Sequence, residues 1–291
     1  MEISKGLRLA IVLSFFILAI EIAGGILSNS LALLSDSGHV FLDMFALGLS
    51  YYAVSLAMRP PTEVATYGLH RAEVLASLVN GLSLIVVASL IFFFAYGRLL
   101  DPPHVQGSTM LIIAVIGLAG NMYVAYRIHD YKSLNVRSAY LHVLGDTLSS
   151  VAVIVGGIAI QLAQTYWIDP ALSFMIAAVI AVGAIRIFVE SADILLEKVP
   201  RHLAPDRLER EIRGVGGVKE VHDLHVWSIC SGHSALSAHV VIADQSLGQA
   251  QDVMHELKRC LQSGFGVEHT TIQFECARCE QGAVMYANDC V

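Results

Sequence analysis

The sequence predicts a membrane domain of six transmembrane helices, followed by a small α+β domain outside the membrane. Hydrophobic residues make up 55% of the 291 residues, above the roughly 45–50% that is usual for soluble domains. The mean hydropathy is +0.64. Charged residues are sparse up to about Val189 and become frequent from Glu190 onward. This change of composition marks a boundary between a membrane part and a water-exposed part.

Six apolar segments, separated by glycine, proline and charged residues, predict the six helices. They cover approximately residues 9–27, 31–58, 72–100, 109–128, 138–162 and 171–189. Each is close to or longer than the ~20 residues that a helix needs to cross a bilayer. Lys and Arg gather before the first segment, in the second and fourth loops and after the sixth segment. The positive-inside bias therefore places both termini in the cytoplasm, and we expect a multi-pass protein of the cell (inner) membrane.

Two of the segments carry the same motif, His-x-x-x-Asp: His39 and Asp43 in the second, His142 and Asp146 in the fifth. Residues four apart share a helix face, so each helix presents an imidazole and a carboxylate in one direction. Counted from opposite membrane surfaces, Asp43 lies ~18 Å deep and Asp146 ~13 Å deep, which is one level in a core ~30 Å thick. Two nitrogens and two oxygens complete a four-coordinate zinc site. The quartet is therefore a predicted transport site.

The residue types in this quartet favour Zn²⁺, with Cd²⁺ and Co²⁺ plausible, because imidazole suits such metals whereas all-oxygen sites suit Mg, Ca and Mn. An imidazole near its ordinary pKa of about 6.5 takes a proton when the metal leaves. Metal and proton then exclude each other, which is the chemistry of an antiporter. In the alternative interpretation, each His–Asp pair is only a structural pair within its helix. Ionisable side chains cost roughly 2.5–3.5 kcal/mol each inside a membrane, which argues against four of them serving structure alone.

Further polar residues interrupt the apolar segments. Asp36 shares a helix face with the first His–Asp pair, and we expect it to widen the access path, to hold a neighbour by a hydrogen bond, or to be a further ligand. Glu21, Asn80 and Asn121 are expected to form hydrogen bonds between helices.

The part after the sixth segment is predicted to fold in the order helix, strand, strand, helix, strand, over residues 205–213, 218–229, 235–242, 247–261 and 267–274. All five cysteines lie here, and in a reducing compartment they are not expected to form disulfides. Cys276 and Cys279 form a C-x₂-C motif, half a zinc site, and Cys290 follows. A second metal site and a solvated tail with incidental histidines both fit this pattern. The histidines are His222, His225, His233, His239, His255 and His269.

Four stretches of the sequence resemble the cation diffusion facilitator family of zinc transporters: SLALLSDSGHVFLD, YGLHRAE, SAYLHVLGDTLSS and VHDLHVWSI. The resemblance covers nearly the whole chain. It implies a ferredoxin-like (metallochaperone-like) cytoplasmic domain, a homodimer, and exchange of Zn²⁺ for protons at the two His-x-x-x-Asp pairs. Manganese-type members have Asp in place of both His, so the motifs are similar to those of zinc-selective members.

The resemblance also implies residues outside the membrane. It indicates His222, His239 and Glu275 as ligands of a cytoplasmic metal site. The pair Cys276 and Cys279 is similar to the C-terminal cysteine pair of vesicular zinc transporters. The remaining implications are a further loop site that includes His70, and an ion pair between Arg71 and Glu197.

The sequence thus predicts a zinc efflux transporter that works by alternating access, with the lipid bilayer, protons and a second copy of the chain as partners and no nucleic acid. We expect four regions: a transport domain over 1–189, a linker over 190–204, a regulatory and dimerisation domain over 205–276 and a cysteine-containing tail over 277–291. We do not expect an enzyme, because an intramembrane metallohydrolase needs a motif such as H-E-x-x-H, which does not occur in the sequence. A metal-sensing receptor would explain the tail ligands but not the quartet.

Overall fold

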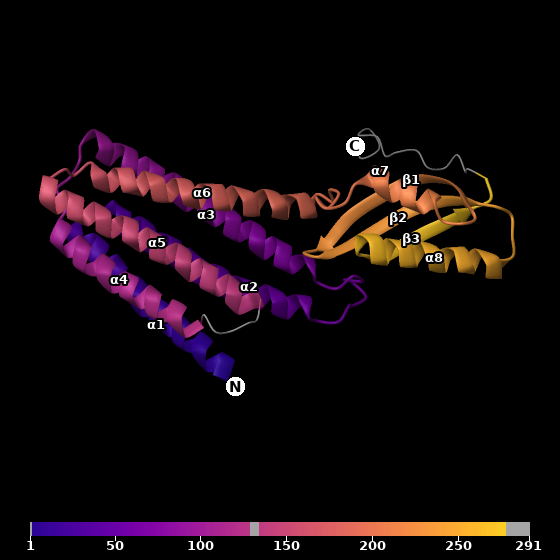
Figure 1. Ribbon diagram of the computed structural model, residues 1–291, viewed down its shortest axis with the longest axis horizontal. Helices are drawn as coiled ribbons and strands as arrows, with labels where there is room; N and C mark the ends of the chain where they lie inside the picture. The colour runs from indigo at the N-terminus through magenta and orange to yellow at the C-terminus, as the bar shows by residue number, and fades with distance from the viewer. Residues whose placement is uncertain (1, 129–133, 278–291) are drawn as a thin grey trace. The chain divides into compact units, whose positions relative to one another are not determined.

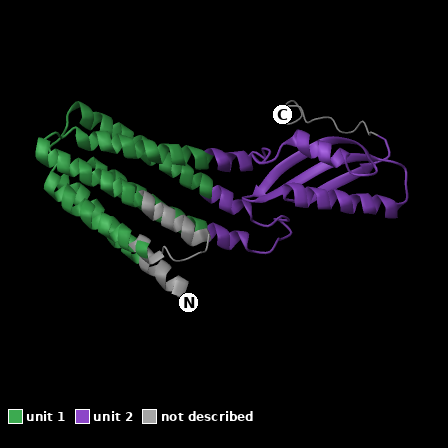
Figure 2. Ribbon diagram, in the orientation of Figure 1, with its two compact units in different colours: residues 1–51, 77–188 green, residues 52–76, 189–291 purple. Residues whose placement is uncertain are grey.

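Figure 1 shows the computed structural model of the chain, which describes residues 2–128 and 134–277. Within its helices, the side chains of residues 2–11, 124–125, 127–128 and 134–145 lie outside the description. The chain divides into two compact units, 1–51 with 77–188 and 52–76 with 189–291 (Figure 2).

Six long helices come first, and each covers one predicted apolar segment to within a residue. Four of them have described parts long and apolar enough to cross a membrane: α2, α3, the Asp146–Ala163 part of α5, and α6. The described parts of the other two, Val12–Ser28 and Gly107–Tyr123, are shorter apolar helices. The bounds of the six are α1 Glu2–Ser28, α2 Leu31–Ala57, α3 Arg71–Leu100, α4 Gly107–Ile128, α5 Leu134–Ala163 and α6 Ile168–Leu195.

Apolar residues of all sizes fill the interior of unit 1, and many large apolar residues also face outward. Ala32, Met110 and Val153 are completely buried, whereas Phe93 is 72% exposed and Val179 is 70% exposed. Extensive exposed apolar surface marks a region that contacts membrane or protein. This distribution is what helices require when their outer faces meet lipid rather than water.

A buried carboxylate fixes the start of α2. Asp169, at the beginning of α6, is fully buried and accepts hydrogen bonds from Ser30 Oγ at 2.5 Å, Leu31 N at 2.8 Å and Ala32 N at 3.3 Å. The first backbone N–H groups of a helix have no partner within the helix and carry partial positive charge. The carboxylate therefore satisfies the free end of α2 from a different helix.

Arg98 of α3 joins the same network. Its guanidinium lies 3.8 Å from the carboxylate of Asp169 and donates to the backbone oxygen of Asn29 at 2.7 Å. Asn29 forms the tight turn between α1 and α2 with φ of +54°, a left-handed conformation that Asn tolerates better than most residues. We call Asn29, Ser30, Arg98 and Asp169 the α2 clamp, because they hold the turn before α2 against α3 and α6.

The tail folds in the predicted order, with strands one or two residues longer than expected. It consists of α7 Pro205–Arg213, β1 Val218–Cys230, β2 His233–Ile242, α8 Leu247–Phe265 and β3 Val267–Glu275. The sheet order is β1-β2-β3, with β1 and β2 antiparallel and β2 and β3 parallel. The parallel pair requires a crossover connection, which α8 supplies (Figure 1).

Both tail helices pack their apolar faces against the sheet. Leu208 and Ile212 of α7, and Leu257 and Leu261 of α8, are completely buried in one core with Leu236 of β2. A capping box at Ser246 begins α8 and Gly266, in the left-handed conformation, ends it. These local signals place β3 directly after α8, so the last strand ends beside β2.

We predict that Asp169→Asn lowers the thermal stability of the detergent-solubilised protein. The amide keeps one acceptor oxygen but loses the charge that strengthens the bonds to the start of α2, a loss of about 2–4 kcal/mol for two such bonds. Asp101→Asn, at an exposed carboxylate just after α3, is the matched control and should leave the melting temperature unchanged. Equal melting temperatures for both variants and wild type would contradict the clamp.

Candidate metal centres

The first candidate centre lies in unit 1, on α2 and α5. His39 and Asp43 share one face of α2, with His39 Nδ1 3.3 Å from Asp43 Oδ2. Asp146 of α5 is buried, at 9% exposure. His142 also lies in α5, but its side chain falls outside the described ones. Within the described part, His39, Asp43 and Asp146 do not form a set whose ligand atoms all lie within 4.8 Å of one another.

A hydrogen bond between the two helices fixes their register. Ser149 Oγ of α5 donates to the carboxylate of Asp36 on α2, and α2 and α5 run antiparallel (Figure 1). From this contact, three residues forward on α2 is His39 and three residues back on α5 is Asp146. Seven residues forward is Asp43, and seven residues back is His142. Each histidine is thus at the level of the aspartate on the other helix, which refines the depth estimate made from the sequence.

The hydrogen bonds of the polar residues in the apolar helices differ in part from those expected from the sequence. Asp36, whose role the sequence left open, is 3% exposed and is the hydrogen-bond partner of Ser149. Hydrogen bonds between helices were expected for Glu21 and Asn80. In the described structure, however, Glu21 Oε2 and Asn80 Oδ1 are buried without a hydrogen-bond partner. Sequence reasoning missed Ser149, since a serine one turn beyond the second motif carries no signal of its own.

The second candidate centre lies in the tail, where three strands bring three ligands together. His222 of β1 and His239 of β2 are cross-strand partners. Glu275, the last residue of β3, is paired with Val241, two residues from His239 on the same strand. Residues two apart on a strand share a face of the sheet. Within the described residues, these three form the one set of potential ligands whose atoms all lie within 4.8 Å.

The carboxylate of Glu275 bridges the two imidazoles. Its Oε1 lies 2.9 Å from His239 Nδ1 and its Oε2 lies 3.3 Å from His222 Nε2, while the carboxylate itself is 2% exposed. Both ring nitrogens of His222, including the Nε2 that faces Glu275, are buried without a hydrogen-bond partner in the described structure. Buried polar atoms are normally paired, so an unpaired imidazole nitrogen beside a buried carboxylate is suited to a metal. Two nitrogens and one oxygen also match the ligands that zinc accepts.

A β-bulge shapes this centre. The register of β1 against β2 shifts between His222 and His225, and Asp223 has φ of +51°. Bulges of this kind re-aim side chains next to functional sites. Asp223 Oδ2 lies 3.7 Å from His239 Nε2 and Asp223 Oδ1 lies 2.9 Å from His225 Nε2, so the bulge places a second carboxylate beside the cluster. The sequence pattern gave no indication of this bulge or of the place of Asp223 beside the cluster.

The cysteines do not join this cluster in the described structure. Cys276 follows Glu275 and is exposed, while Cys279 and Cys290 lie outside the described residues. Burial raises the pKa of the Cys230 and Cys260 thiols. Since the thiolate is the form that binds metal, these two are poor candidates for ligands.

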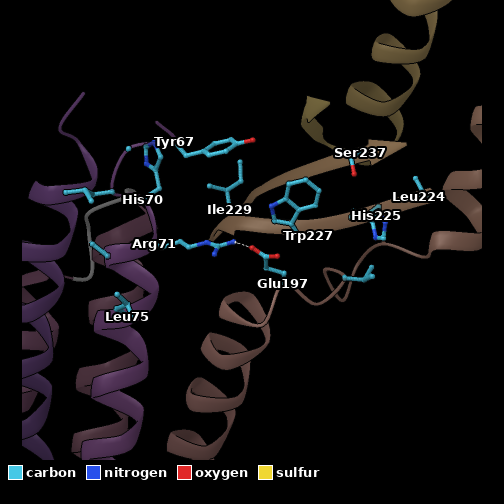
Figure 3. Close-up of a pocket in the computed structure, with 15 residues that line it drawn as sticks. Tyr67, His70, Arg71, Leu75, Glu197, Leu224, His225, Trp227, Ile229 and Ser237 are labelled. Carbon is cyan, nitrogen blue, oxygen red and sulfur yellow. Dashed lines mark hydrogen bonds and ion pairs between the residues drawn. The ribbon is translucent and has the colours of Figure 1, made fainter. Parts of the chain in front are cut away.

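The other histidines are placed elsewhere. His269, left open by the sequence, contacts the ring of Tyr67 edge-on with centroids 5.4 Å apart, and His233 lies 3.1 Å from Glu268. His70 lines a cavity of about 840 Å³ within unit 2, together with His225 and Trp227 (Figure 3). In the described residues His70 belongs to no set of three close ligands, so its role as a ligand stays a prediction.

The predicted ion pair between Arg71 and Glu197 forms. The guanidinium Nη2 lies 2.8 Å from Glu197 Oε1, with side chains 39% and 59% exposed, at the wall of the same cavity (Figure 3). Glu197 follows α6 with φ of +56°, a conformation that costs a non-glycine residue energy.

Comparison with known proteins matches both the helical part and the tail of the chain to cation efflux proteins. The family model of the cation efflux transmembrane domain matches residues 7–196, and the model of the cation efflux protein cytoplasmic domain matches residues 200–277. A solved structure of the metal-bound C-terminal domain of the CzcD transporter from Cupriavidus metallidurans is 40% identical and covers 25% of this chain and 99% of that chain, with a TM-score of 0.23.

Three full-length relatives illustrate the similarity. The metal cation efflux system protein CzcD of Cupriavidus metallidurans is 38% identical over 95% of this chain and 88% of its own length. The zinc transporter ZitB of Escherichia coli is 36% identical over 89% of this chain and 83% of its own. The human proton-coupled zinc antiporter SLC30A8 is 31% identical over 90% of this chain and 73% of its own.

We predict that Glu275→Gln lowers the zinc bound per protomer, because the neutral amide lacks the charge that would hold a cation between two imidazoles. The matched control is Glu268→Gln, which removes an exposed carboxylate from the same strand. Zinc content is measured by elemental analysis of purified, anaerobically handled protein. The same zinc content in both variants and wild type would exclude Glu275 as a ligand.

We predict a small coupling energy between Arg71 and Glu197. Exposed ion pairs contribute about 0–1 kcal/mol, and a double-mutant cycle with alanine at each position measures this value directly. The exposed pair Arg213–Glu209, with atoms 2.8 Å apart, is the matched control. A coupling several times that of the control would show that the first pair is shielded from water in the assembled protein, and additive losses would show that the two side chains do not interact.

Proposed function

The chain belongs to the cation diffusion facilitator family, and we propose that it is an efflux transporter for Zn²⁺ that exchanges the metal for protons by alternating access. The observation that carries the proposal is the register of α2 and α5. It sets the two His-x-x-x-Asp pairs at one level on two apolar helices, fixed by the Asp36–Ser149 hydrogen bond. The relatives' names, which include a zinc transporter and a proton-coupled zinc antiporter, support the same function.

We propose that all six long helices cross the membrane, with both termini in the cytoplasm. The protein is a multi-pass membrane protein with at least four helices able to span a bilayer. The apolar part of α1 precedes these four helices in the chain and that of α4 lies between α3 and α5, and the distribution of Lys and Arg supports the orientation. The cell (inner) membrane and the domain bounds predicted from the sequence are parts of this proposal.

In the proposed mechanism, the quartet His39, Asp43, His142 and Asp146 binds the transported ion in place of its water. Two carboxylates neutralise the charge of a divalent cation, which lowers the cost of carrying it through an apolar layer. The imidazoles favour Zn²⁺ over metals that prefer oxygen alone. Protons compete with the metal for the same side chains. When the metal leaves on one side of the membrane, protons from that side therefore bind the emptied side chains.

The tail, in this proposal, is a ferredoxin-like regulatory domain that binds metal through His222, His239 and Glu275 and joins two copies of the chain. The matching family model describes a cytoplasmic domain, and its sheet with two helices supports the fold. The bridging carboxylate at 2.9 and 3.3 Å from the two imidazoles supports the metal site. Cys276, Cys279 and His70 remain further proposed ligands. The family consists of transporters, and we propose no enzymatic activity.

We predict that Asp43→Ala and Asp146→Ala each abolish zinc transport while the protein remains folded, because a cation then keeps three ligands and one compensating charge. The measurement is zinc uptake into proteoliposomes under an imposed pH gradient, repeated with Cd²⁺, Co²⁺, Mn²⁺ and Fe²⁺. Asp252→Ala, an exposed acidic residue on α8, is the control and should transport as wild type does. Wild-type transport by either membrane variant would refute the assignment of the site.

A further inference from the structure

One buried carboxylate in unit 1 is used neither by the quartet nor by the α2 clamp. Glu21, in the last third of α1, is 2% exposed, and its Oε2 is buried without a hydrogen-bond partner among the described residues. The charged groups that act on it are Asp36 from α2 and Asp146 from α5, and both are acidic. Among the described residues, the charged groups that act on Glu21 are thus two further carboxylates from two other helices, and none is basic.

The fold keeps room for this carboxylate. The residue that faces it from α4 is Gly117, and a Cβ atom there would lie only 2.5 Å from Glu21 Oε1. Any side chain at this position would displace the carboxylate. Helix α4 therefore offers a space beside Glu21 that only glycine leaves open.

An ionised carboxylate in this position needs a positive partner. Burial of an unpaired charge is very costly, and ionisable residues within membrane helices by default mark the path of an ion. Two neighbouring carboxylates increase the cost. Glu21 must therefore hold a cation, either a metal ion or a proton, for much of the transport cycle.

The geometry favours the proton. A zinc ion needs about four ligand atoms at roughly 2.0–2.3 Å and binds imidazole or thiolate as well as carboxylate, whereas among the described residues the charged groups that act on Glu21 are two carboxylates. A proton needs a single oxygen. The cluster also connects with the transport site, because Ser149 binds Asp36 and lies 3.2 Å from the backbone oxygen of Asp146.

We propose that Glu21 is a proton-carrying residue of the metal exchange, an inference that rests on the proposed antiport. While the quartet is without metal, Glu21 is a neutral carboxylic acid. When Zn²⁺ binds the quartet, the O–H bond of Glu21 breaks, one proton leaves to the aqueous side that is then open, and the carboxylate that remains is stabilised by the nearby cation, which offsets the negative charge that Asp146 otherwise presents to Glu21. When Zn²⁺ leaves on the other side, one proton from that side restores the acid.

The first test is Glu21→Gln, which keeps the size of the side chain but holds no exchangeable acid proton. Zinc is titrated into the purified full-length protein in weakly buffered detergent solution, and released protons are counted with a pH indicator. We expect about one proton fewer per zinc bound than in wild type, with the number of zinc ions bound unchanged. Zinc uptake driven by a pH gradient should fall severalfold in proteoliposomes.

A matched pair of glycine variants separates the role of the carboxylate from helix packing. In Gly117→Ala the new Cβ meets Glu21 Oε1, and in Gly120→Ala the new Cβ meets Ile17 Cδ1, in both cases at 2.5 Å. Both changes disturb the contact of α4 with α1, but only the first displaces the carboxylate. We expect Gly117→Ala to change the number of protons released and Gly120→Ala to leave it unchanged.

The outcomes are distinct. An unchanged proton count in Glu21→Gln overturns the proposal, and a loss of bound zinc in this variant would make Glu21 a metal ligand instead, which also overturns it. Equal effects of the two glycine variants would assign the result to packing and overturn it as well. Should Glu21→Gln fail to fold, the glycine pair still decides. If wild-type protein binds zinc but transports none, the proposed function fails, while the proton count still tests Glu21.

Discussion

The interior of unit 1 contains buried carboxyl groups, and the placement of its helices follows from how these groups are satisfied by hydrogen bonds. Asp169 compensates the free N–H groups of α2 and holds Arg98 at the other side of the same turn. Further along α2, Asp36 accepts a hydrogen bond from Ser149. These two contacts fix the start of α2 and its register against α5. The histidine and aspartate of the first motif then have defined neighbours.

The two candidate metal centres use the same chemistry with different supports. In unit 1, the candidate ligands are spaced four apart on helices, and the Asp36–Ser149 hydrogen bond sets the two helices in register. In the tail, cross-strand pairing of His222 with His239 brings two imidazoles together, and β3 delivers Glu275 beside them. The membrane centre suits a cation that must arrive and leave. The tail centre combines a buried bridging carboxylate with strands that hold their register, which suits a resident ion.

The proposed proton step on Glu21 would extend the exchange beyond the four ligands. If metal and protons competed for the quartet alone, the charge of the site would be set by those residues only. A further acid on α1, a helix that carries none of the proposed metal ligands, would change its protonation when the quartet binds or releases the metal. The glycine that leaves room for Glu21 would then be as much a part of the transport machinery as the charged residues.

The sequence alone determined the six apolar helices, the order of the tail elements and the two motifs, because periodicity, breakers and ligand spacing are local properties of the chain. The family followed from those motifs. The hydroxyl of Ser149, the clamp at Asp169 and the space at Gly117 could not be predicted, because each acts on a residue at least 96 positions away in the chain. The bulge at Asp223 was equally hidden. Contacts between distant segments depend on how helices and strands pack, which only the tertiary structure decides.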